Sequence, residues 1–437
     1  MTTIYALSSG HGKAGVAIIR VSGPSAGDAL HRLASAIPRP RVASLRTLRD
    51  PASREVLDRG LIIWFPGPLS FSGEDMAELH IHGGRAVIEG VFRALSSIDG
   101  LRPAEPGEFA RRAFENGKLD LTEAEGLADL IDAETEAQRR QALRQSGGAL
   151  RALYDGWRER LIVALASIEA ELDFSDEGDV PDAIAQAALD AAGALRAEIS
   201  AHLADGRGGE ILRDGLRVVI AGPPNAGKSS LMNALARRDV AIVSAEAGTT
   251  RDVIEVRLDL SGFPVVLMDT AGIREAGGDI EREGIRRALE RVGEADLVLW
   301  LGDATRPHGP PPDAVGNARM ILAVNKIDLT LATDWGDALP LSVKTGAGLD
   351  RLLARLTEEV RQAADIGESP AITRARHRRE LERCAAALCR FRSGDFAALE
   401  LRAEDLRDAA TALGRLTGRV DVEDILDRIF AEFCIGK

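Results

Sequence analysis

The chain has 437 residues, of which 45% are hydrophobic and 28% are charged, and a formal net charge of −13 at pH 7. Its length exceeds what one hydrophobic core usually supports, so two or three domains are expected. The negative charge argues against non-specific nucleic-acid binding. No apolar run approaches the roughly 20 residues of a membrane span, and the first residues lack a signal-peptide pattern. Three cysteines are too few for a disulfide framework, so we expect a soluble cytoplasmic protein with no membrane attachment.

Residues 1–118 have the pattern of a small mixed α/β domain. Apolar or alternating runs predict strands at 16–21, 61–65 and 77–82, and a helix follows at 86–92. His80 and His82 would fall on the same side of the third strand. Because no third metal ligand is evident nearby, a polar wall of a ligand pocket is favoured over a metal site.

From residue 119 the periodicity becomes helical. Thr122, with Glu125 three residues later, fits a capping box that opens a helical pattern continuing to Ile168. An acidic stretch at 173–182 interrupts this pattern before a second helix, expected from about Ala183 to Leu203. Glycines at 206–209 then predict a hinge into a different domain.

Helical patterns resume at about Thr373 and run to the C-terminus, so the sequence predicts a domain inserted into a helical one. The resumed pattern begins with a basic cluster. A solvated helix face is the first interpretation of this cluster, and contact with RNA or an acidic partner is the alternative. The cluster consists of Arg374, Arg376, Arg378 and Arg379.

The inserted segment begins with a phosphate-binding motif. Residues 222–229, GPPNAGKS, match the pattern G-x-x-x-x-G-K-[ST]. An apolar run at 217–221 predicts a strand before the motif, and 230–235 predicts a helix after it, which is the context that the motif requires. Backbone N–H groups of such a loop hold phosphate oxygens. Lys228 would reach the β- and γ-phosphates, and Ser229 would bind Mg²⁺.

A second motif selects the base. Asn325, Lys326 and Asp328 follow an apolar strand at 320–324. The Asp328 carboxylate can accept two hydrogen bonds from N1–H and the exocyclic amine of guanine, and adenine offers no such pair of donors. The chain is therefore predicted to bind GTP.

Two segments between these motifs resemble switch regions. Residues 248–252, GTTRD, supply Thr250 for the Mg²⁺ shell. Asp269, at the end of a strand predicted at 265–268, would lie in the second shell of the metal, and the Gly272 N–H would sense the γ-phosphate. Ile273 occupies the position where a Ras-like GTPase carries the glutamine that orients water. The acidic stretch 274–284 is therefore expected to supply a replacement.

The predicted GTP contacts extend over all of these loops. They are Asn225, Ala226, Gly227, Lys228, Ser229, Ser230, Ser244, Ala245, Glu246, Ala247, Gly248, Thr249, Thr250, Asp269, Thr270, Ala271, Gly272, Asn325, Lys326, Asp328, Ser342, Val343 and Lys344.

Together these motifs resemble the MnmE (TrmE) family of tRNA modification GTPases. The resemblance includes strings at 66–75, 106–109 and 116–121 and the terminal FCIGK at 433–437, so it covers essentially the whole chain. It implies an α/β plus α fold in three domains. These are an N-terminal α/β folate-binding and dimerisation domain, a helical domain in two parts, and an inserted Ras-like G domain with a mostly parallel sheet. Their implied bounds are 1–118, 119–210 with 366–437, and 211–365.

The resemblance also implies an activity and partners. A homodimer would act with the flavoprotein MnmG (GidA), in a heterotetramer-type complex, on carbon 5 of the wobble uridine of certain tRNAs. The product would carry an aminomethyl or carboxymethylaminomethyl group. The transferred carbon would come from a reduced folate, formyl- or methylene-tetrahydrofolate.

The resemblance implies site residues as well. The implied folate contacts are Arg20, Glu78, Lys118 and Lys437. A K⁺ ion would be held by Asn225, Ser244, Glu246 and Thr249. Glu281 would orient the attacking water, and Cys434 would act in the modification.

Two other classes of function stay open from the sequence. A ribosome-assembly switch related to the Era and Der GTPases predicts a basic RNA-binding module or a second G domain, and neither is recognisable. An interaction scaffold with incidental hydrolysis would be distinguished by measurements of turnover.

Overall fold

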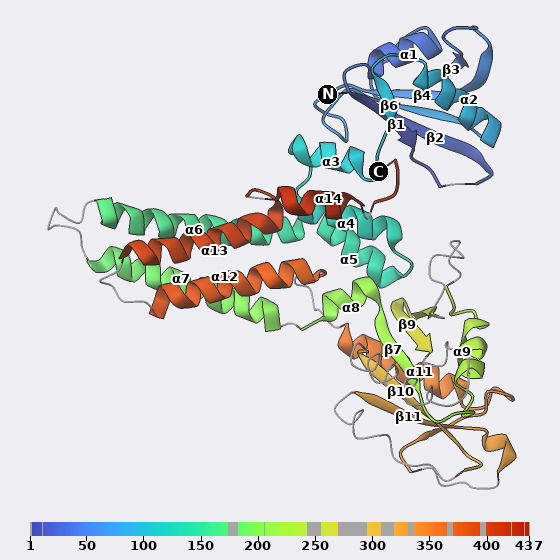
Figure 1. Cartoon of the computed structure of the whole chain (residues 1–437), viewed down its shortest axis with the longest axis vertical. Helices are drawn as coiled ribbons and strands as arrows, with labels where there is room; N and C mark the ends of the chain where they lie inside the picture. The colour runs from blue at the N-terminus through green and yellow to red at the C-terminus, as the bar shows by residue number, and fades with distance from the viewer. Residues whose placement is uncertain are drawn as a thin grey trace, which may run out of the picture. The chain divides into compact units, whose positions relative to one another are not determined.

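Figure 1 shows the whole chain in the computed structural model. The chain divides into two compact units. Unit 1 comprises Met1–Ala128, Ser146–Val163 and Arg407–Lys437, and unit 2 comprises Asp129–Gln145 and Ala164–Leu406. The residues that the structure describes are 2–10, 12–173, 182–204, 206–242, 255–269, 295–306, 319–330, 336–364, 370–393, 399–420, 422–431 and 433–436.

Unit 1 is built on a six-stranded mixed sheet with the order β3-β4-β5-β2-β1-β6. β1 pairs antiparallel with β2 and parallel with β6. Helices α1 (Ala26–Ala34) and α2 (Arg85–Ser96) pack on one face and bury its alternate side chains. The predicted strands and helix are confirmed. The strands are β1 (Thr3–Leu7), β2 (Ala14–Ser22), β3 (Ser44–Arg49), β4 (Val56–Phe65), β5 (Met76–Gly83) and β6 (Leu101–Pro103).

The C-terminal segment is part of unit 1. Phe430 and Phe433 lie in one buried cluster with Leu121 and Ala124. Beyond them, Ile435 forms a β-bridge with Pro106, and Gly436 accepts a hydrogen bond from the Ser8 hydroxyl over 2.8 Å. Gly436 has a φ of +99°, and a Cβ there would collide with the carbonyl oxygen of Leu7. Only glycine fits this position. The helices that complete the unit's helical part include α3 (Glu108–Glu115), α4 (Leu121–Asp132) and α14 (Glu423–Ala431).

The capping box of α4 lies two residues earlier than predicted. The Glu123 N–H donates to Asp120 Oδ1 over 2.7 Å, and the Asp120 N–H donates to Glu123 Oε2 over 2.7 Å. The prediction that Thr122 and Glu125 form this box is wrong, because Thr122 is already inside the helix. Its hydroxyl donates to Asp120 Oδ1 instead. Burial raises the pKa of Asp120 to about 6 despite these hydrogen bonds.

Asp120 should make stability depend on pH. Its raised pKa means that the folded protein keeps a proton which the unfolded chain releases between about pH 4 and pH 6. The free energy of unfolding should therefore fall as the pH rises through this window, relative to that of Asp120→Asn, by about 3 kcal/mol. Denaturant unfolding of both proteins at several pH values measures the difference. Parallel curves would contradict the assignment, and Asp120→Ala should be about 1 kcal/mol less stable than Asp120→Asn at every pH, because alanine cannot cap the helix.

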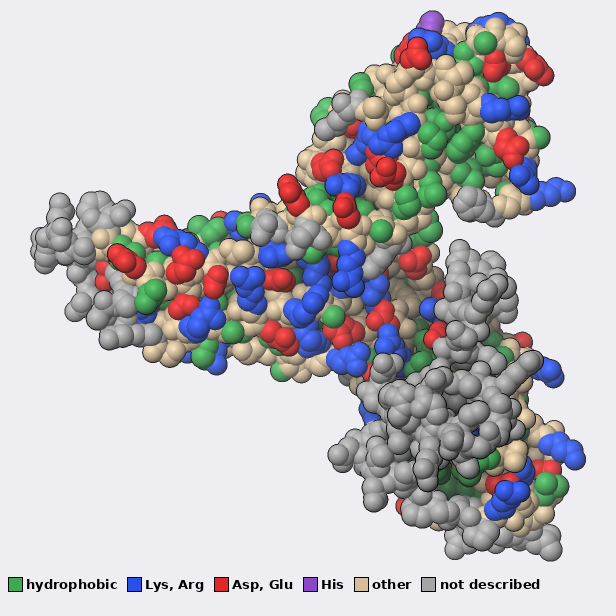
Figure 2. Space-filling model, viewed as in Figure 1, with side chains coloured by type: hydrophobic (Ala, Val, Ile, Leu, Met, Phe, Trp, Pro, Cys, Tyr) green, Lys and Arg blue, Asp and Glu red, His purple; other side chains and the backbone are tan. Residues whose placement is uncertain are grey.

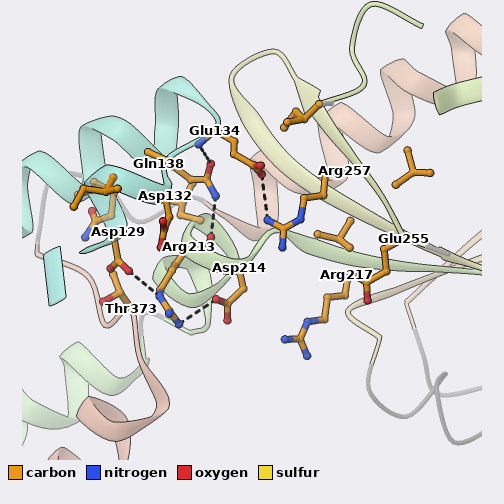
Figure 3. Close-up of a pocket in the computed structure, with 18 of the residues that line it drawn as sticks. Asp129, Asp132, Glu134, Gln138, Arg213, Asp214, Arg217, Glu255, Arg257 and Thr373 are labelled. Atoms are coloured by element: carbon orange, nitrogen blue, oxygen red, sulfur yellow. Dashed lines mark hydrogen bonds and ion pairs between the residues drawn. The ribbon is translucent and has the colours of Figure 1, made fainter. Parts of the chain in front are cut away.

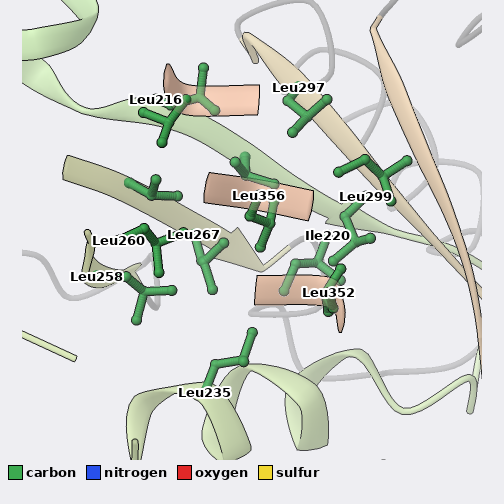
Figure 4. Packing of buried hydrophobic residues seen from close by; sticks show 14 of the residues in the cluster. Leu216, Ile220, Leu235, Leu258, Leu260, Leu267, Leu297, Leu299, Leu352 and Leu356 are labelled. Atoms are coloured by element: carbon green, nitrogen blue, oxygen red, sulfur yellow. The ribbon is translucent and has the colours of Figure 1, made fainter. Parts of the chain in front are cut away.

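Unit 2 contains a second six-stranded sheet with the order β12-β11-β10-β7-β9-β8. All neighbours are parallel except β8 and β9, which form an antiparallel hairpin. Leucines from the strands and from α11 fill the core beside α9 (Figure 4). The elements are β7 (Leu216–Ala221), α9 (Lys228–Ala236), β8 (Glu255–Leu260), β9 (Phe263–Asp269), β10 (Leu297–Asp303), β11 (Met320–Asn325), η2 (Ile327–Leu329), β12 (Leu339–Pro340) and α11 (Leu349–Ala363).

The long helical pattern expected up to Ile168 is broken twice. It forms three helices, because the pattern is interrupted by the turn before Glu136 and by Gly147 and Gly148. The expected glycine hinge is also wrong in part, since Gly208 and Gly209 begin a short helix. The helices are α5 (Glu136–Ser146), α6 (Ala149–Asp173), α7 (Asp182–Ala204), α8 (Gly208–Asp214), α12 (Ala375–Ser393) and α13 (Leu399–Thr417). None of the helices within the described ranges has the length and apolar content of a membrane span.

The basic cluster at the start of α12 is not simply a solvated face. Arg374 is largely buried and pairs with Asp129 over 2.8 Å. Arg378 pairs with Glu210 over 3.1 Å and donates to the carbonyl of Gly206. These arginines bind acidic groups of their own chain, which neither interpretation of the sequence foresaw.

Candidate nucleotide-binding site

The phosphate loop joins β7 to α9, as the motif predicts. Gly227 has a φ of +98°, and a Cβ there would collide with the side-chain nitrogen of Asn325. Asn225 is also left-handed, with a φ of +62°. Left-handed residues of this kind help to turn backbone N–H groups toward one concave side, which makes an anion-binding loop at a helix N-terminus.

Asn325 connects the phosphate loop to the loops on the base side. Its amide nitrogen donates to the carbonyl of Ala226 over 2.8 Å. Its amide oxygen accepts from the Val343 N–H over 3.0 Å. The side chain is buried, with 3% of the residue exposed. One amide therefore sets the spacing between three loops that are far apart in the sequence.

Lys228 lies within the phosphate loop. Its ammonium donates to the carbonyls of Gly222 and Pro223 over 3.0 and 3.1 Å. Burial lowers the pKa of Lys228, and the nearby Asp269 carboxylate opposes that shift. Phosphate oxygens would replace these neutral carbonyls by anionic partners, so binding would favour the charged ammonium.

The structure places Ser229 beside Asp269. The Ser229 hydroxyl donates to Asp269 Oδ2 over 2.8 Å, and 2% of Asp269 is exposed. Hard cations such as Mg²⁺ prefer oxygen ligands of this kind and keep several of their waters. The pair fits the predicted arrangement, in which the hydroxyl binds the ion and the carboxylate orients its waters.

The Asp328 carboxylate is oriented by a hydrogen bond. The Ser342 hydroxyl donates to Asp328 Oδ1 over 2.7 Å, and Ser342 itself is fully buried. Orientation of one carboxylate oxygen leaves the other free to turn toward a guanine base. Ser342 thus has a defined task, whereas Lys344 lies exposed at this loop.

Lys326 binds a residue that the sequence analysis missed. Its ammonium donates to the Asn225 carbonyl over 2.7 Å and to Asp303 Oδ2 over 2.6 Å. Burial would raise the pKa of Asp303, but hydrogen bonds from Lys326 and Thr305 outweigh it and lower the pKa to about 2. Asp303 therefore stays ionised and holds Lys326 against the phosphate loop. The sequence did contain a signal for this residue, because Asp303 ends the apolar run that forms β10.

Asp303→Asn should weaken nucleotide binding. The loss of a charge-assisted bond of this kind costs about 1.5–3 kcal/mol, so we expect roughly a tenfold or greater rise in the Kd for GDP. Titration with fluorescent mant-GDP measures this Kd. Asp350→Asn is the matched control. Asp350, like Asp303, pairs with a basic side chain of unit 2, in this case Arg238, but the Asp350 side chain is 86% exposed. An unchanged Kd for Asp303→Asn would show that Lys326 needs no such partner.

Many predicted contacts lie outside the described residues. They are Ser244, Ala245, Glu246, Ala247, Gly248, Thr249, Thr250, Thr270, Ala271, Gly272, Glu281 and Lys437.

A smaller cavity in unit 1 contains two of the predicted folate residues. It has a volume of about 350 Å³ and is lined by residues that include Arg20, Glu78 and Phe71. Arg20 pairs with Glu78 over 3.0 Å, and its guanidinium lies 5.4 Å from the centre of the Phe71 ring. Arg20 Nε is buried without a partner among the described residues. A ligand carbonyl or carboxylate would satisfy it.

The remaining predicted residues of unit 1 have different environments. Lys118 does not line the cavity, but its stem lies beside Gly73, within contact distance of a Cβ built there. His80 Nε2 lies 3.3 Å from Glu78 Oε2, which fits a polar pocket wall better than a metal site. Cys434 is exposed. No group of three or more metal-ligating His, Cys, Asp or Glu side chains occurs within the described ranges.

A phosphate loop after β7 and an Asn-Lys-x-Asp loop after β11, joined by Asn325, define a guanine-nucleotide-binding protein of the P-loop class. Family models agree with this class. One described as the MnmE helical domain matches residues 121–434, and one described as the GTP-binding protein TrmE N-terminus matches residues 3–118.

Full-length relatives narrow the class. The tRNA modification GTPase MnmE of Maricaulis maris is 56% identical over 439 residues, and the match covers 100% of both chains. The protein of the same name from Parvibaculum lavamentivorans is 57% identical over 446 residues, again with 100% of both chains covered. The chain belongs to the MnmE family of tRNA modification GTPases.

Solved structures add little to this assignment. An Era protein of Aquifex aeolicus is 25% identical, and the match covers 39% of this chain and 66% of that one. Its TM-score of 0.27 is too low to carry an argument. The relatives that span the whole chain are tRNA modification GTPases, so the ribosome-assembly alternative has no comparable support.

Proposed function

We propose that this chain hydrolyses GTP and uses the hydrolysis to drive modification of carbon 5 of the wobble uridine in certain tRNAs. The observation that carries the GTPase part is the linkage of Asn325 to Ala226 and Val343, with Asp328 oriented by Ser342. Through this linkage, the loop proposed to bind phosphate is hydrogen-bonded to the loops proposed to bind guanine. The tRNA part rests on membership of a family whose relatives carry that activity in their names.

The proposed site needs two cations. Ser229 and Thr250 would hold Mg²⁺, and a K⁺ ion would lie at Asn225 with Ser244, Glu246 and Thr249. Among the described contacts, the Asn225 carbonyl is taken by Lys326 and its side-chain amide makes no hydrogen bond. That amide oxygen can therefore serve a weakly hydrated cation, which would neutralise charge between the β- and γ-phosphates.

Glu281 is proposed to orient the attacking water, because Ile273 cannot. Glu281→Ala should keep GTP affinity and lose about 10²-fold or more in kcat, the size typical of a positioned acid–base group. Single-turnover hydrolysis in KCl, with NaCl at equal ionic strength as the comparison, measures the effect. Wild-type turnover should be much faster in KCl. Unchanged turnover of the variant would remove Glu281 from the mechanism, and equal wild-type rates in both salts would remove the K⁺ ion.

The modification chemistry is proposed to take place on unit 1. A reduced folate, formyl- or methylene-tetrahydrofolate, would bind at Arg20 and Glu78, with Lys118 and Lys437 contributing cations to its carboxylates or carbonyls. Support comes from the cavity of about 350 Å³ and the unpaired Arg20 Nε. This volume is within the range of small-molecule sites.

A homodimer is proposed because one face of the unit 1 sheet carries exposed hydrophobic side chains on β2, β3 and β4. α1 and α2 cover only the opposite face, whereas Val16, Leu45 and Leu61 are 57%, 51% and 44% exposed. Leu45 and Leu61 are cross-strand neighbours. Hydrophobic side chains also gather over β1 and β2 in Figure 2. A second copy would cover this apolar surface. The flavoprotein MnmG is the proposed partner of the dimer.

The proposed activities are assigned to three domains of the chain. Residues 1–118 would bind folate and dimerise, 119–210 with 366–437 would form the helical domain, and 211–365 would form the G domain. GTP hydrolysis and modification would then occur on different parts of one chain.

Cys434 is proposed to act in the modification. Its neighbours are docked on unit 1 through Phe433, Ile435 and Gly436, while the thiol itself is exposed. Cys434→Ser should therefore abolish modification while GTP hydrolysis continues. Mass spectrometry of wobble-uridine nucleosides, in tRNA from a deletion strain that carries each variant, measures this loss. Modification at the wild-type level would leave Cys434 with a packing role only.

A further inference from the structure

The open end of the β8–β9 hairpin lies at the candidate nucleotide site, because Glu255 of β8 pairs with Met268, the neighbour of Asp269. β8 follows residues 243–254, which contain the proposed cation ligands, and β9 ends at Asp269, which the Ser229 hydroxyl binds. The turn at Ser261 and Gly262 closes the other end. Seven strand residues separate the turn from the end of β9, a span of about 20 Å at the usual rise per residue.

The tip of this hairpin contacts the first turn of α5. The Ala137 N–H, one of the donors that a helix start leaves unsatisfied, donates to the Gly262 carbonyl over 3.0 Å. A Cβ built at Gly262 would lie in contact with Glu136. Arg257 of β8 also pairs with Glu134 over 3.1 Å. The hairpin thus binds the residues from Glu134 to Ala137, at the start of α5, at two points.

The same residues are held from a second side. The Gln138 amide donates to the Arg213 carbonyl over 2.9 Å, while its oxygen accepts from Thr135 N–H. Asp129, at the end of α4, pairs with Arg213 over 3.0 Å and Arg374 over 2.8 Å. Segment 129–138 therefore lies between the hairpin on one side and α8, with the residues before α12, on the other.

The contact with the hairpin can change at small cost. Arg257 is 49% exposed and Glu134 is 26% exposed, and such pairs typically contribute about 0.2–1 kcal/mol. A cavity of about 1240 Å³ adjoins the contact, and its walls come from α4, α5, α8 and the hairpin (Figure 3). Because this space is open, the hairpin and segment 129–138 can shift without the cost of repacking a filled core.

We propose that the β8–β9 hairpin passes the nucleotide state to segment 129–138 through the Ala137–Gly262 hydrogen bond and the Arg257–Glu134 pair. This inference rests on the proposed GTPase function and assigns a regulatory output to the same site. A nucleotide that shifts either end of the hairpin moves its tip, and the two contacts are then stronger in one nucleotide state than in the other. Such a differential contact is what coupling between two sites requires.

Hydrogen exchange on the full chain tests the coupling directly. We expect the amides of residues 134–138 to exchange at different rates with GDP and with GDP plus aluminium fluoride, both in KCl and MgCl₂. Peptides from α11 serve as the internal reference. Mant-nucleotide binding to the same samples reports separately on the proposed function. Equal exchange of residues 134–138 in the two nucleotide states would overturn the proposal.

Charge reversal then tests whether the coupling matters. Arg257→Glu should lower wobble-uridine modification about fivefold or more, a typical size for allosteric coupling, while GTP turnover stays within about threefold. Adding Glu134→Arg should restore modification. Arg390→Glu is the matched control, because Arg390 is 53% exposed and its partner Asp405 is 21% exposed. Modification by Arg257→Glu equal to that of Arg390→Glu would show that the hairpin contact has no output.

Discussion

The buried amide of Asn325 is the interaction on which the nucleotide site depends. Its nitrogen donates to the Ala226 carbonyl on the phosphate loop, and its oxygen accepts from the Val343 N–H on the base-side loop. The absence of a side chain at Gly227 gives the amide its room. Because an unsatisfied buried amide is costly, the three loops keep one spacing, and Lys326 stays in contact with the phosphate loop at the Asn225 carbonyl.

Both halves of the proposed chemistry depend on long-range contacts of this kind. In unit 1, Arg20 from β2 meets Glu78 from β5, and the chain's last residues pack beside Pro106 and Ser8. In unit 2, Asp269 at the end of β9 meets Ser229 at the start of α9. Each site is thus assembled from segments that the sheet order brings together. The β8–β9 hairpin extends from Asp269, in the candidate nucleotide site, to the start of α5, where the Gly262 carbonyl accepts from the Ala137 N–H.

The sequence predicted the features that depend on neighbouring residues. It could not predict contacts between residues that are far apart in the chain. The phosphate loop was predicted from a contiguous motif between a strand and a helix. Contiguous apolar or alternating runs likewise predicted β2, β4 and β5 of the first sheet and β7, β9 and β11 of the second, whereas the other strands of the two sheets were not predicted. The cap of α4 was misplaced, because Asp120 and Thr122 both satisfy the spacing rule and only the helix start decides between them. Asp303 and the pairing of Arg374 with Asp129 were missed, since 23 residues separate Asp303 from Lys326 and 245 separate Arg374 from Asp129.

Selection of the purine base is the most direct test of the account. Calorimetric titration of the full chain should show GDP binding far more tightly than ADP. Asp328→Asn should reverse the preference toward xanthosine diphosphate, because the new amide donates to the O2 atom that replaces the guanine amine. Equal affinity for GDP and ADP in the wild-type chain, or undiminished GDP affinity in the variant, would contradict the proposed guanine site.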